Sequence, residues 1–393
     1  MIYVGIDVAS KKHDIVILNE VGEIFNKHFT IPNTMKGYKK LLSEINLAKE
    51  FFNDSQVRIG LESTGHYSRN ILYFLILKGY SVTLINPLLT NMDRKASSVR
   101  KTKTDSIDAK AICMFLLRNQ NDFKPYTLLS YHIDELKILV RQRKSLKKQS
   151  NRTMNQLHAF IDQAFPEYYK VFKKINSNAS LKLLAHYASI SEFKRVRVNT
   201  LAQLIKKASK GHHGLNKAQL IKTLIKDSIG IDSHALSLSI KQSVNMIEEI
   251  NSQINQINIS IKDHIDNSNT TLLSIPGIGY QTGAIILAEI GDIHRFKSDD
   301  ELLAYAGLDP SVYQSGNYNG SFKISKRGSS ILRWAIFQAA KVAVIHDPVF
   351  NAYYLKKINE GKHYFTVIGH VTKKLLRVIR SILKTNSVYS ISH

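Results

Sequence analysis

The sequence predicts a multidomain protein of the α/β plus α class, with one α/β domain at the N-terminus and two mainly helical regions after it. Three observations indicate this class. Runs of β-branched residues alternate with helical segments over roughly the first 120 residues, two long stretches of helical periodicity occupy the middle of the chain, and the C-terminal region is again mostly helical. The length of 393 residues suits two or three domains at roughly 100–200 residues each.

The N-terminal region is expected to form a sheet flanked by helices. Strands are predicted at 2–8, 13–18, 23–31, 57–61 and 81–85, and helices at 34–51, 67–78 and 105–117. Three leading strands followed by alternating helices and strands indicate one α/β domain. The polar segment 119–125 is predicted to be the linker that ends it, so the first domain is expected to span residues 1–125.

The middle region, predicted to span 126–268, contains two long helices at 133–164 and 235–265, with a helical insert at 166–230 between them. In the second helix, isoleucines recur every seven residues, at Ile240, Ile247, Ile254 and Ile261, with Ile250 and Ile257 at a second heptad position. This spacing is typical of a coiled coil. A long helix packed inside one chain gives the same pattern, and so does pairing with the 133–164 helix, so the sequence leaves these arrangements open. A third domain is predicted over 269–393.

Composition excludes several classes of protein. Hydrophobic residues make up 44% of the chain, with only 19 Gly and 7 Pro, which excludes disordered and collagen-like chains. The single cysteine, Cys113, excludes a disulfide framework and a zinc site built from cysteines, and it fits a reducing cytoplasm. No apolar run approaches the roughly 18 residues that span a bilayer, so no membrane partner is expected.

The formal net charge of +24 is concentrated in stretches that contain no acid. The first stretch contains Arg94, Lys95, Arg100, Lys101 and Lys103. The first long helix contributes Arg141, Arg143, Lys144, Lys147, Lys148 and Arg152, and the C-terminal region contributes Lys323, Lys326, Arg327 and Arg333. The tail from Gly361 onward is a fourth such stretch. One basic stretch is commonly a solvated helix face, but four favour a nucleic-acid partner, because neutralising phosphates requires such clusters.

Four carboxylates fall where the predicted sheet and helix would gather them. Asp7 ends the first strand in the sequence GID, and Glu62 ends the strand VRIGLE. Asp105 and Asp108 are three residues apart in KTDSIDAKAI, so a helix places both on one face. Such oxygens are ligands for Mg²⁺ or Mn²⁺, ions that assist phosphodiester cleavage. Each acid also has an ordinary explanation, as a turn residue or as a favourable acid in the first turn of a helix.

A strand ending in Gly-Ile-Asp also opens the actin-like and sugar-kinase folds, which bind ATP. Those folds need glycine-rich phosphate loops after later strands. The one candidate loop, Pro276 to Gly279, has no predicted strand before it. The sequence therefore disfavours a kinase.

The segment LLSIPGIGYQTGAIILAEIG has a helix-hairpin-helix-like pattern. Gly277 and Gly279 would permit a tight turn, and the N-terminus of the following helix would offer backbone N–H groups to a phosphate. An ordinary corner between two helices is the alternative, and the basic surroundings favour contact with DNA.

A polar loop containing Ser315 and Gly316 precedes the C-terminal basic residues. A serine hydroxyl that attacks a phosphodiester conserves the bond energy in a phosphoserine link, so the strand can be resealed without ATP. Six serines lie between Ser311 and Ser330, and the chemistry of the residues does not choose among them.

Taken in order, the motifs GIDVASKKHDIVI, GLESTGHYS, KTDSIDAKAI, VRQRKSLKKQSNRTMNQLHA, IPGIGYQTGAIILAEIGD and YQSG with ISKRGSSILRWAI form a recognisable series. The sequence resembles the DEDD transposases of bacterial insertion sequences, the family often called "IS one-ten", which is related to Piv-type DNA invertases. The resemblance covers nearly the whole chain and is least specific over 166–230. It implies an N-terminal RuvC-like domain of the ribonuclease H fold, a helical coiled-coil middle and a C-terminal transposase domain.

The resemblance also implies roles for five residues. Asp7, Glu62, Asp105 and Asp108 would be the family's metal-binding carboxylates, and Ser315 its nucleophile. It further implies DNA partners at the element ends and target, assembly as a homo-oligomer (dimer or tetramer), a place in the bacterial cytoplasm at the nucleoid and, in related members, guidance by a structured RNA.

The leading hypothesis is therefore a DNA transposase or site-specific recombinase that uses Mg²⁺ (or Mn²⁺) and a covalent phosphoserine–DNA intermediate. The first alternative is a metal-dependent hydrolytic nuclease of the Holliday-junction type, which would nick DNA without an adduct. The second is a DNA-binding protein without catalysis, which would have no reason to gather four acids beside a basic stretch.

Overall fold

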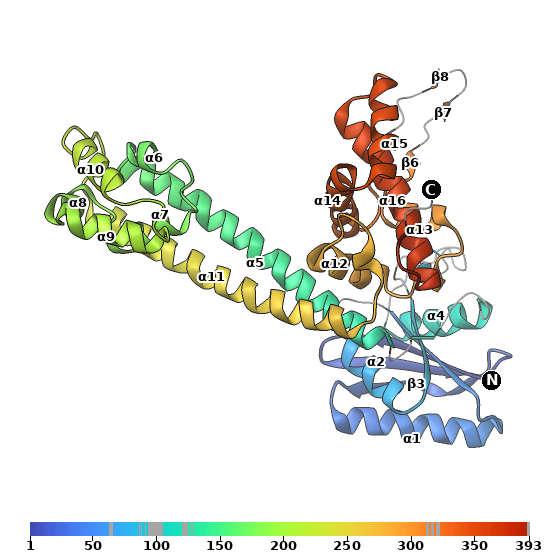
Figure 1. Ribbon diagram of the computed structural model, residues 1–393. Coiled ribbons are helices and arrows are strands. Elements are labelled where there is room, and N and C mark those ends of the chain that lie inside the picture. The colour runs from blue at the N-terminus through green and yellow to red at the C-terminus, as the bar shows by residue number, and fades with distance from the viewer. Residues whose placement is uncertain are drawn as a thin grey trace. The chain divides into compact units, whose positions relative to one another are not determined.

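The computed structural model describes residues 1–62, 66–85, 87, 89–90, 92, 105–119, 125–126, 129–311, 314–315, 318–319 and 323–390 (Figure 1). They form two compact units, Met1–His132 and Ile133–His393. The division of the second unit at residues 268 and 269 stays a prediction. The basic stretch Arg94–Lys103 and most of the linker 119–125 lie outside the described residues. Within the described part of the chain, no helix is long and apolar enough to cross a membrane.

The first unit contains a five-stranded mixed sheet. Its elements are β1 (Ile2–Val8), β2 (Lys12–Leu18), β3 (Ile24–Pro32), α1 (Met35–Phe52), β4 (Val57–Glu62), α2 (Ser68–Leu77), β5 (Ser81–Ile85) and α4 (Asp105–Arg118). The strand order is β3-β2-β1-β4-β5; β1, β2 and β3 pair antiparallel, and β4 and β5 run parallel to β1. This sheet agrees with the RuvC-like, ribonuclease H fold that the resemblance implies.

The sheet is covered by helices on both faces (Figure 1). Successive side chains of a strand point to opposite faces. Ile2, Val4 and Ile6 of β1 lie in a core with residues of α1 and α2, whereas Tyr3 packs with Cys113 and other residues of α4. The odd-numbered positions of β1 therefore face α4.

The second unit contains two long helices that lie side by side (Figure 1): α5 (Leu129–Ala164), from Ile133 onward, and α11 (His234–Asn267). At one end of the pair they pack with five shorter helices: α6 (Tyr168–Val171), α7 (Asn178–His186), α8 (Ile190–Arg195), α9 (Val198–Ala208) and α10 (Leu215–Leu224). The predicted helical insert at 166–230 thus has its own hydrophobic core, to which α5 and α11 contribute.

The heptad isoleucines of α11 are buried within the chain, except Ile257, which is half-buried. Ile240 and Ile247 lie in the core with the short helices, Ile254 packs with Leu146 of α5, and Ile261 lies in the core of the C-terminal helices. This burial agrees with the intramolecular alternatives to an interchain coiled coil.

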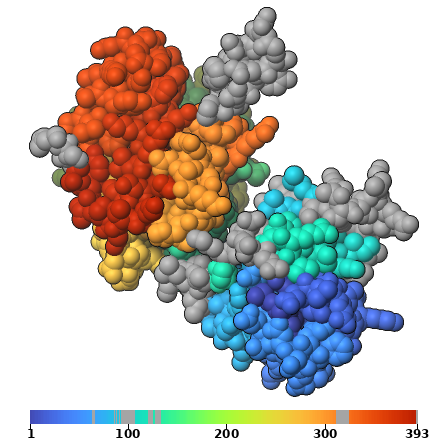
Figure 2. All heavy atoms as spheres, turned by 90° about the vertical axis from the view of Figure 1, so that its right-hand side faces the viewer, coloured from blue at the N-terminus to red at the C-terminus, as the bar shows by residue number. Residues whose placement is uncertain are grey.

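The C-terminal part of the second unit is mainly helical, with four short strands. It contains the 3₁₀ helices η1 (Leu272–Ser274) and η2 (Ile293–Arg295), the helices α12 (Tyr280–Ile290), α13 (Asp299–Tyr305), α14 (Ser330–His346), α15 (Pro348–Asn359) and α16 (Tyr364–Thr385), and the strands β6 (Pro310–Ser311), β7 (Gln314–Ser315), β8 (Tyr318–Asn319) and β9 (Lys323–Ile324). The helices share one core and form one continuous body, coloured orange to red in Figure 2.

Candidate active site

Strand register places two of the predicted carboxylates side by side. Ile6 of β1 pairs with Leu61 of β4, so Asp7 and Glu62 occupy the next positions of two neighbouring parallel strands. Both lie at the C-terminal ends of their strands. Because Asp7 and Tyr3 share the alternation of β1, Asp7 is on the face that α4 covers.

A glycine contact brings α4 directly onto this face. A Cβ atom added at Gly5 would lie 2.3 Å from the carbonyl oxygen of Ala109 and 2.7 Å from the backbone nitrogen of Cys113, so only glycine allows the two backbones to approach so closely. The Cys113 Sγ donates to the carbonyl oxygen of Tyr3 at 3.1 Å. Along α4, residue 109 is beside Gly5, and residue 113 is beside both Gly5 and Tyr3, so α4 runs antiparallel to β1. The N-terminal turn of α4 therefore lies toward Asp7.

This antiparallel arrangement places the first turn of α4, with Asp105 and Asp108, at the sheet end that carries Asp7 and Glu62. Asp108 is half-buried, and the side chain of Asp105 is outside what the structure describes. Among the described side chains, no three His, Cys, Asp or Glu groups are close enough to form a ready metal-ligand cluster. The backbone therefore brings the four positions to one edge of the sheet, and their role as ligands stays a prediction.

Glu62 is oriented by a buried hydroxyl. Thr90, which is almost fully buried, donates a hydrogen bond from its Oγ1 to Glu62 Oε1. Thr90 could not be predicted from the sequence, because its hydrogen bond joins residues 28 positions apart.

A fifth carboxylate, Asp14, lies directly across from Asp7 in the pairing of β1 with β2. It is only 3% exposed, and it accepts hydrogen bonds from Thr30 Oγ1 at 2.6 Å and from His28 Nε2 at 2.8 Å. Burial alone would raise the pKa of Asp14, but the bonds from Thr30, His28 and Lys12 outweigh burial and hold the pKa below its usual value. Sequence reasoning missed Asp14, since its place beside Asp7 depends on the register of the β1–β2 hairpin.

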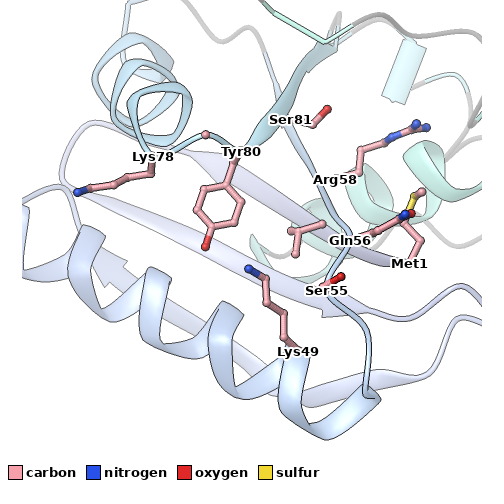
Figure 3. Close-up of a pocket in the computed structure, with 10 residues that line it drawn as sticks. Met1, Lys49, Ser55, Gln56, Arg58, Lys78, Tyr80 and Ser81 are labelled. Carbon is pink, nitrogen blue, oxygen red and sulfur yellow. The ribbon is translucent and has the colours of Figure 1, made fainter.

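A pocket of about 420 Å³ in the same unit lies at the opposite edge of the sheet (Figure 3). It is formed near the start of β4 and β5, by residues that include Met1, Arg58 and Ser81. Lys49 Nζ lies 5.2 Å from the centre of the Tyr80 ring, toward which it points in Figure 3. Because Asp7 and Glu62 lie at the C-terminal ends of their strands, this pocket is separate from the carboxylate edge.

The predicted nucleophile, Ser315, lies in the second unit, on β7. It pairs with Tyr318 of β8, in a two-residue antiparallel ladder. A second short ladder joins the strands on either side of this one in the chain: Ser311 of β6 pairs with Lys323 of β9. Ser315 thus stands on a narrow ribbon between α13 and α14, and Gly316 is outside the described residues.

The basic residues predicted on α5 divide into two groups. Arg143 is half-buried; its Nε donates to Asn258 Oδ1 at 2.7 Å and its Nη2 to Gln281 Oε1 at 2.6 Å, which ties α5 to α11 and α12. Burial lowers the pKa of Arg143. Arg141 is itself exposed, and its Nη2 reaches the buried carboxylate of Glu289 at 3.5 Å. The remaining members of the set are exposed: Lys144, Lys147, Lys148 and Arg152.

The C-terminal basic residues divide in the same way. Arg333 donates from Nη1 to the backbone carbonyl of Ala306 at 2.9 Å, and thereby fixes the turn after α13. Lys326 and Arg327 are exposed. Lys323 is on β9, and its side chain is outside the described part of the structure.

The two glycines of the predicted hairpin motif have different surroundings. Gly277 has φ +93°, and a Cβ there would lie 2.3 Å from the carbonyl oxygen of Ala339 on α14, so Gly277 is required for internal packing. Gly279 precedes α12 and has open space around its Cβ position. Its N–H donates to Thr282 Oγ1 at 3.0 Å. Between the end of α11 at Asn267 and the hairpin, the chain forms only η1, a single 3₁₀ turn. Contact with a phosphate stays a prediction.

Known proteins are similar to this chain along nearly its whole length. Residues 4–166 match a transposase model of the DEDD type named for IS110, and residues 269–355 match the model of the transposase IS116/IS110/IS902 family. The 44.8 kDa protein of insertion element IS116 from Streptomyces clavuligerus is 22% identical, over 99% of this chain and 96% of its own. The pilin gene-inverting protein of Moraxella bovis is 24% identical, over 98% and 96%. Among solved structures, RuvC of Thermus thermophilus matches 32% of this chain and 100% of its own, at 11% identity and a TM-score of 0.24.

Proposed function

The chain belongs to the IS110/IS116 family of insertion-sequence transposases, and from this membership we propose that it cuts and rejoins DNA through a metal-binding carboxylate site and a serine nucleophile. The observation that carries the proposal is the meeting of Asp7, Glu62 and the first turn of α4 at one edge of the sheet. The likeness to a pilin gene-inverting protein extends the proposal to site-specific inversion of DNA.

A divalent cation fits the residues at this edge. The donors are all carboxylate oxygens, which Mg²⁺ and Mn²⁺ prefer to nitrogen or sulfur. Asp7, Glu62, Asp105 and Asp108 would hold it. When bound, such an ion supplies positive charge that stabilises a phosphodiester transition state. The chain's own contribution is orientation, and the hydrogen bond from Thr90 to Glu62 is an example.

In the proposed reaction, the Ser315 hydroxyl oxygen attacks a DNA phosphorus and forms a phosphoserine ester. The bond between that phosphorus and one deoxyribose oxygen breaks, and the leaving oxygen takes up a proton, while the serine loses one. Attack by a deoxyribose hydroxyl on the ester reverses both changes and reseals the strand. No external energy source is needed, because the number of phosphoester bonds is unchanged.

The experiment that tests the nucleophile is denaturing isolation of a protein–DNA adduct on a labelled substrate carrying the element's ends. We expect an adduct with the wild type and none with Ser315→Ala. Ser311→Ala, on the neighbouring short strand β6, is the matched control and should keep the adduct. An adduct with Ser315→Ala would falsify the nucleophile assignment. Nicked DNA without any adduct would point instead to hydrolysis by the carboxylate site.

The same assay tests the carboxylate site. Asp7→Asn should slow adduct formation by about 10³-fold, because several kcal/mol of transition-state stabilisation depend on the cation that Asp7 would hold. Glu50→Gln removes one charge from an exposed position on α1 and should leave the rate unchanged. Cleavage that persists in Asp7→Asn, or in the presence of a chelator, would contradict the metal site.

We also propose that a second copy of the chain takes part. The acids and the serine belong to different units, so two copies can each supply one of these groups to an active site. If the active site combines residues of two copies, a mixture of Asp7→Asn and Ser315→Ala chains should regain part of the activity that each lacks alone. No recovery would indicate that one chain supplies both groups. A structured RNA from the element remains a proposed partner, and omission of RNA from the assay tests its need.

A further inference from the structure

The last helix, α16, is amphipathic, with an apolar face and a basic face. Val371, Leu375 and Ile379 are buried in the core of the C-terminal helices. The sequence contains no Asp or Glu from Gly361 to its end. The basic face therefore has no acid of its own helix to neutralise it, and any counter-charge must come from neighbouring elements or from a ligand.

A pocket of about 380 Å³ opens on this face, between α15 and α16. Its lining residues are Tyr353, His370, Lys373, Lys374 and Arg377. Lys374 Nζ lies 4.9 Å from the centre of the Tyr353 ring and 5.8 Å from that of Phe350. These rings hold the ammonium group by cation–π attraction without removing its charge.

One acid beside the pocket is already paired with other cations. Glu360 lies 2.7 Å from Lys357 Nζ and 2.6 Å from Lys362 Nζ. These two lysines hold the pKa of Glu360 at about 2, so it stays ionised and engaged with them. Glu360 therefore does not compensate the lysines that line the pocket.

A second acid is engaged mainly outside the pocket. Asp299 of α13 accepts from Arg380 Nη1 at 3.0 Å, and its other oxygen is 3.9 Å from Arg377 Nε, at the limit of an ion pair. None of the ion pairs found among the described residues involves Lys373 or Lys374. The pocket thus contains two uncompensated ammonium groups and one guanidinium that is weakly paired.

The titration of His370 reports the same excess of positive charge. Burial lowers the pKa of His370, and the charges of Lys362, Lys357 and Lys373 lower it further, against a smaller opposing effect of Glu360. The imidazole is therefore mostly neutral at pH 7, and it offers a polar, uncharged group beside the cations.

We propose that this pocket binds a phosphate of a nucleic-acid backbone. Clustered lysine and arginine side chains on an acid-free helix face are what phosphate neutralisation requires, and Tyr353 adds an aromatic surface of the kind that nucleotides contact. The proposal rests on the proposed function, which supplies nucleic acid as substrate. Of the five lining residues, only Tyr353 lies within the segment 269–355 that the family model matches, so that match does not assign the pocket.

The experiment compares a double variant, Lys373→Gln with Lys374→Gln, against Lys384→Gln, which changes an exposed lysine in the last turn of α16 outside the pocket. Affinity for a DNA duplex and for an RNA hairpin is measured by fluorescence anisotropy over a series of salt concentrations. We expect about a tenfold loss of affinity in the double variant, and a slope of log K against log salt that is smaller by about two. The control should change the slope by at most about one.

The two ligands identify the source of the phosphate. A loss confined to the duplex assigns the pocket to DNA, a loss confined to the hairpin assigns it to RNA, and a loss for both indicates the backbone shared by the two. Double-variant affinity equal to that of the control overturns the inference. So does a change in self-association without loss of nucleic-acid affinity, because the pocket would then receive an acidic segment of another copy.

The adduct assay separates this inference from the proposed function. A wild-type chain that forms the adduct, with a double variant that binds like the control, defeats the inference alone. A wild-type chain that forms no adduct, yet binds through these lysines, defeats the proposed chemistry alone. Arg377→Gln is the second variant. It leaves the lysine–aromatic contacts in place and should also lower affinity. The test therefore still decides the inference if the double variant misfolds.

Discussion

The carboxylate edge of the first unit and the basic surface of the second unit are built in different ways. The carboxylate edge depends on backbone geometry: the register of β1 with β4 and the close contact at Gly5 determine where Asp7, Glu62 and the first turn of α4 lie. The basic surface depends on side chains spread along several helices. Arg143 and Arg333 are engaged in internal hydrogen bonds, while Lys144 and others are exposed.

The net charge includes basic groups that make internal hydrogen bonds as well as basic groups that are exposed to solvent. A net charge of +24 counts every arginine equally. In the structure, the guanidinium of Arg143 has its planar fork satisfied by amide oxygens, a geometry that an ammonium cannot reproduce. The exposed lysines are then the better candidates for contact with phosphates, and the internal arginines contribute mainly to stability.

The largest effect expected on stability tests the backbone contact at Gly5. Gly5→Ala should destabilise the first unit by about 3 kcal/mol, because the new methyl group would overlap backbone atoms of Ala109 and Cys113 that cannot move independently of α4. Hydrogen exchange of β1 amides should then accelerate by about a hundredfold. Gly279→Ala is the control for an added methyl group, since open space surrounds its Cβ position. Because Gly279 caps the N-terminus of α12, its effect should be up to about 1 kcal/mol, without any effect on exchange in β1. Unchanged exchange in Gly5→Ala would show that α4 does not rest on β1.

The next effect separates the structural cations of α5 from those predicted to bind nucleic acid. Arg143→Ala should cost about 2 kcal/mol, since two hydrogen bonds of a half-buried charged group are lost. Lys144→Ala, one residue along, should cost less than about 0.5 kcal/mol but reduce the salt slope of DNA binding by about one. Thermal unfolding and anisotropy titrations measure the two quantities. If Arg143→Ala were stable and Lys144→Ala bound DNA like the wild type, the division between the two groups would be wrong.

Local chemistry explains what the sequence predicted well. The strands of the first unit are β-branched runs, and serine or threonine caps begin several helices; Thr34, for example, accepts from the N–H of Gly37 at the start of α1. Asp7 and Glu62 could be placed together because both end strands of one sheet, and the structure puts them at neighbouring positions.

What the sequence could not predict depends on contacts between distant residues. The partners of Arg143 are 115 and 138 positions away, so nothing near it in the chain distinguishes it from Lys144. The steric role of Gly277 depends on α14, and the predicted turn gave no sign of that contact. Asp14 was missed because a hairpin of unknown register does not say which residue faces Asp7.

The smallest expected effect concerns Asp14, and it asks whether the carboxylate edge extends beyond the four predicted acids. Asp14 lies directly across the strand pair from Asp7. Despite its burial, the hydrogen bonds from Thr30, His28 and Lys12 hold the pKa of Asp14 below its usual value, so its carboxylate is ionised near neutral pH. A cation held by Asp7 would be attracted by this neighbouring negative charge. Asp14→Asn keeps the shape of the side chain and removes the charge, and we expect affinity for Mn²⁺, measured by calorimetry on the full chain, to fall by about tenfold.

The alternative is that Asp14 only holds β2 and β3 together through Thr30 and His28. In that case Asp14→Asn would lower the unfolding temperature and leave Mn²⁺ affinity unchanged. Thr30→Val removes one of those hydrogen bonds and leaves the Asp14 charge in place, so it should reproduce the loss of stability without the loss of affinity. Only a difference between these two variants in Mn²⁺ binding assigns the Asp14 charge to the site, because both weaken the same strand contact.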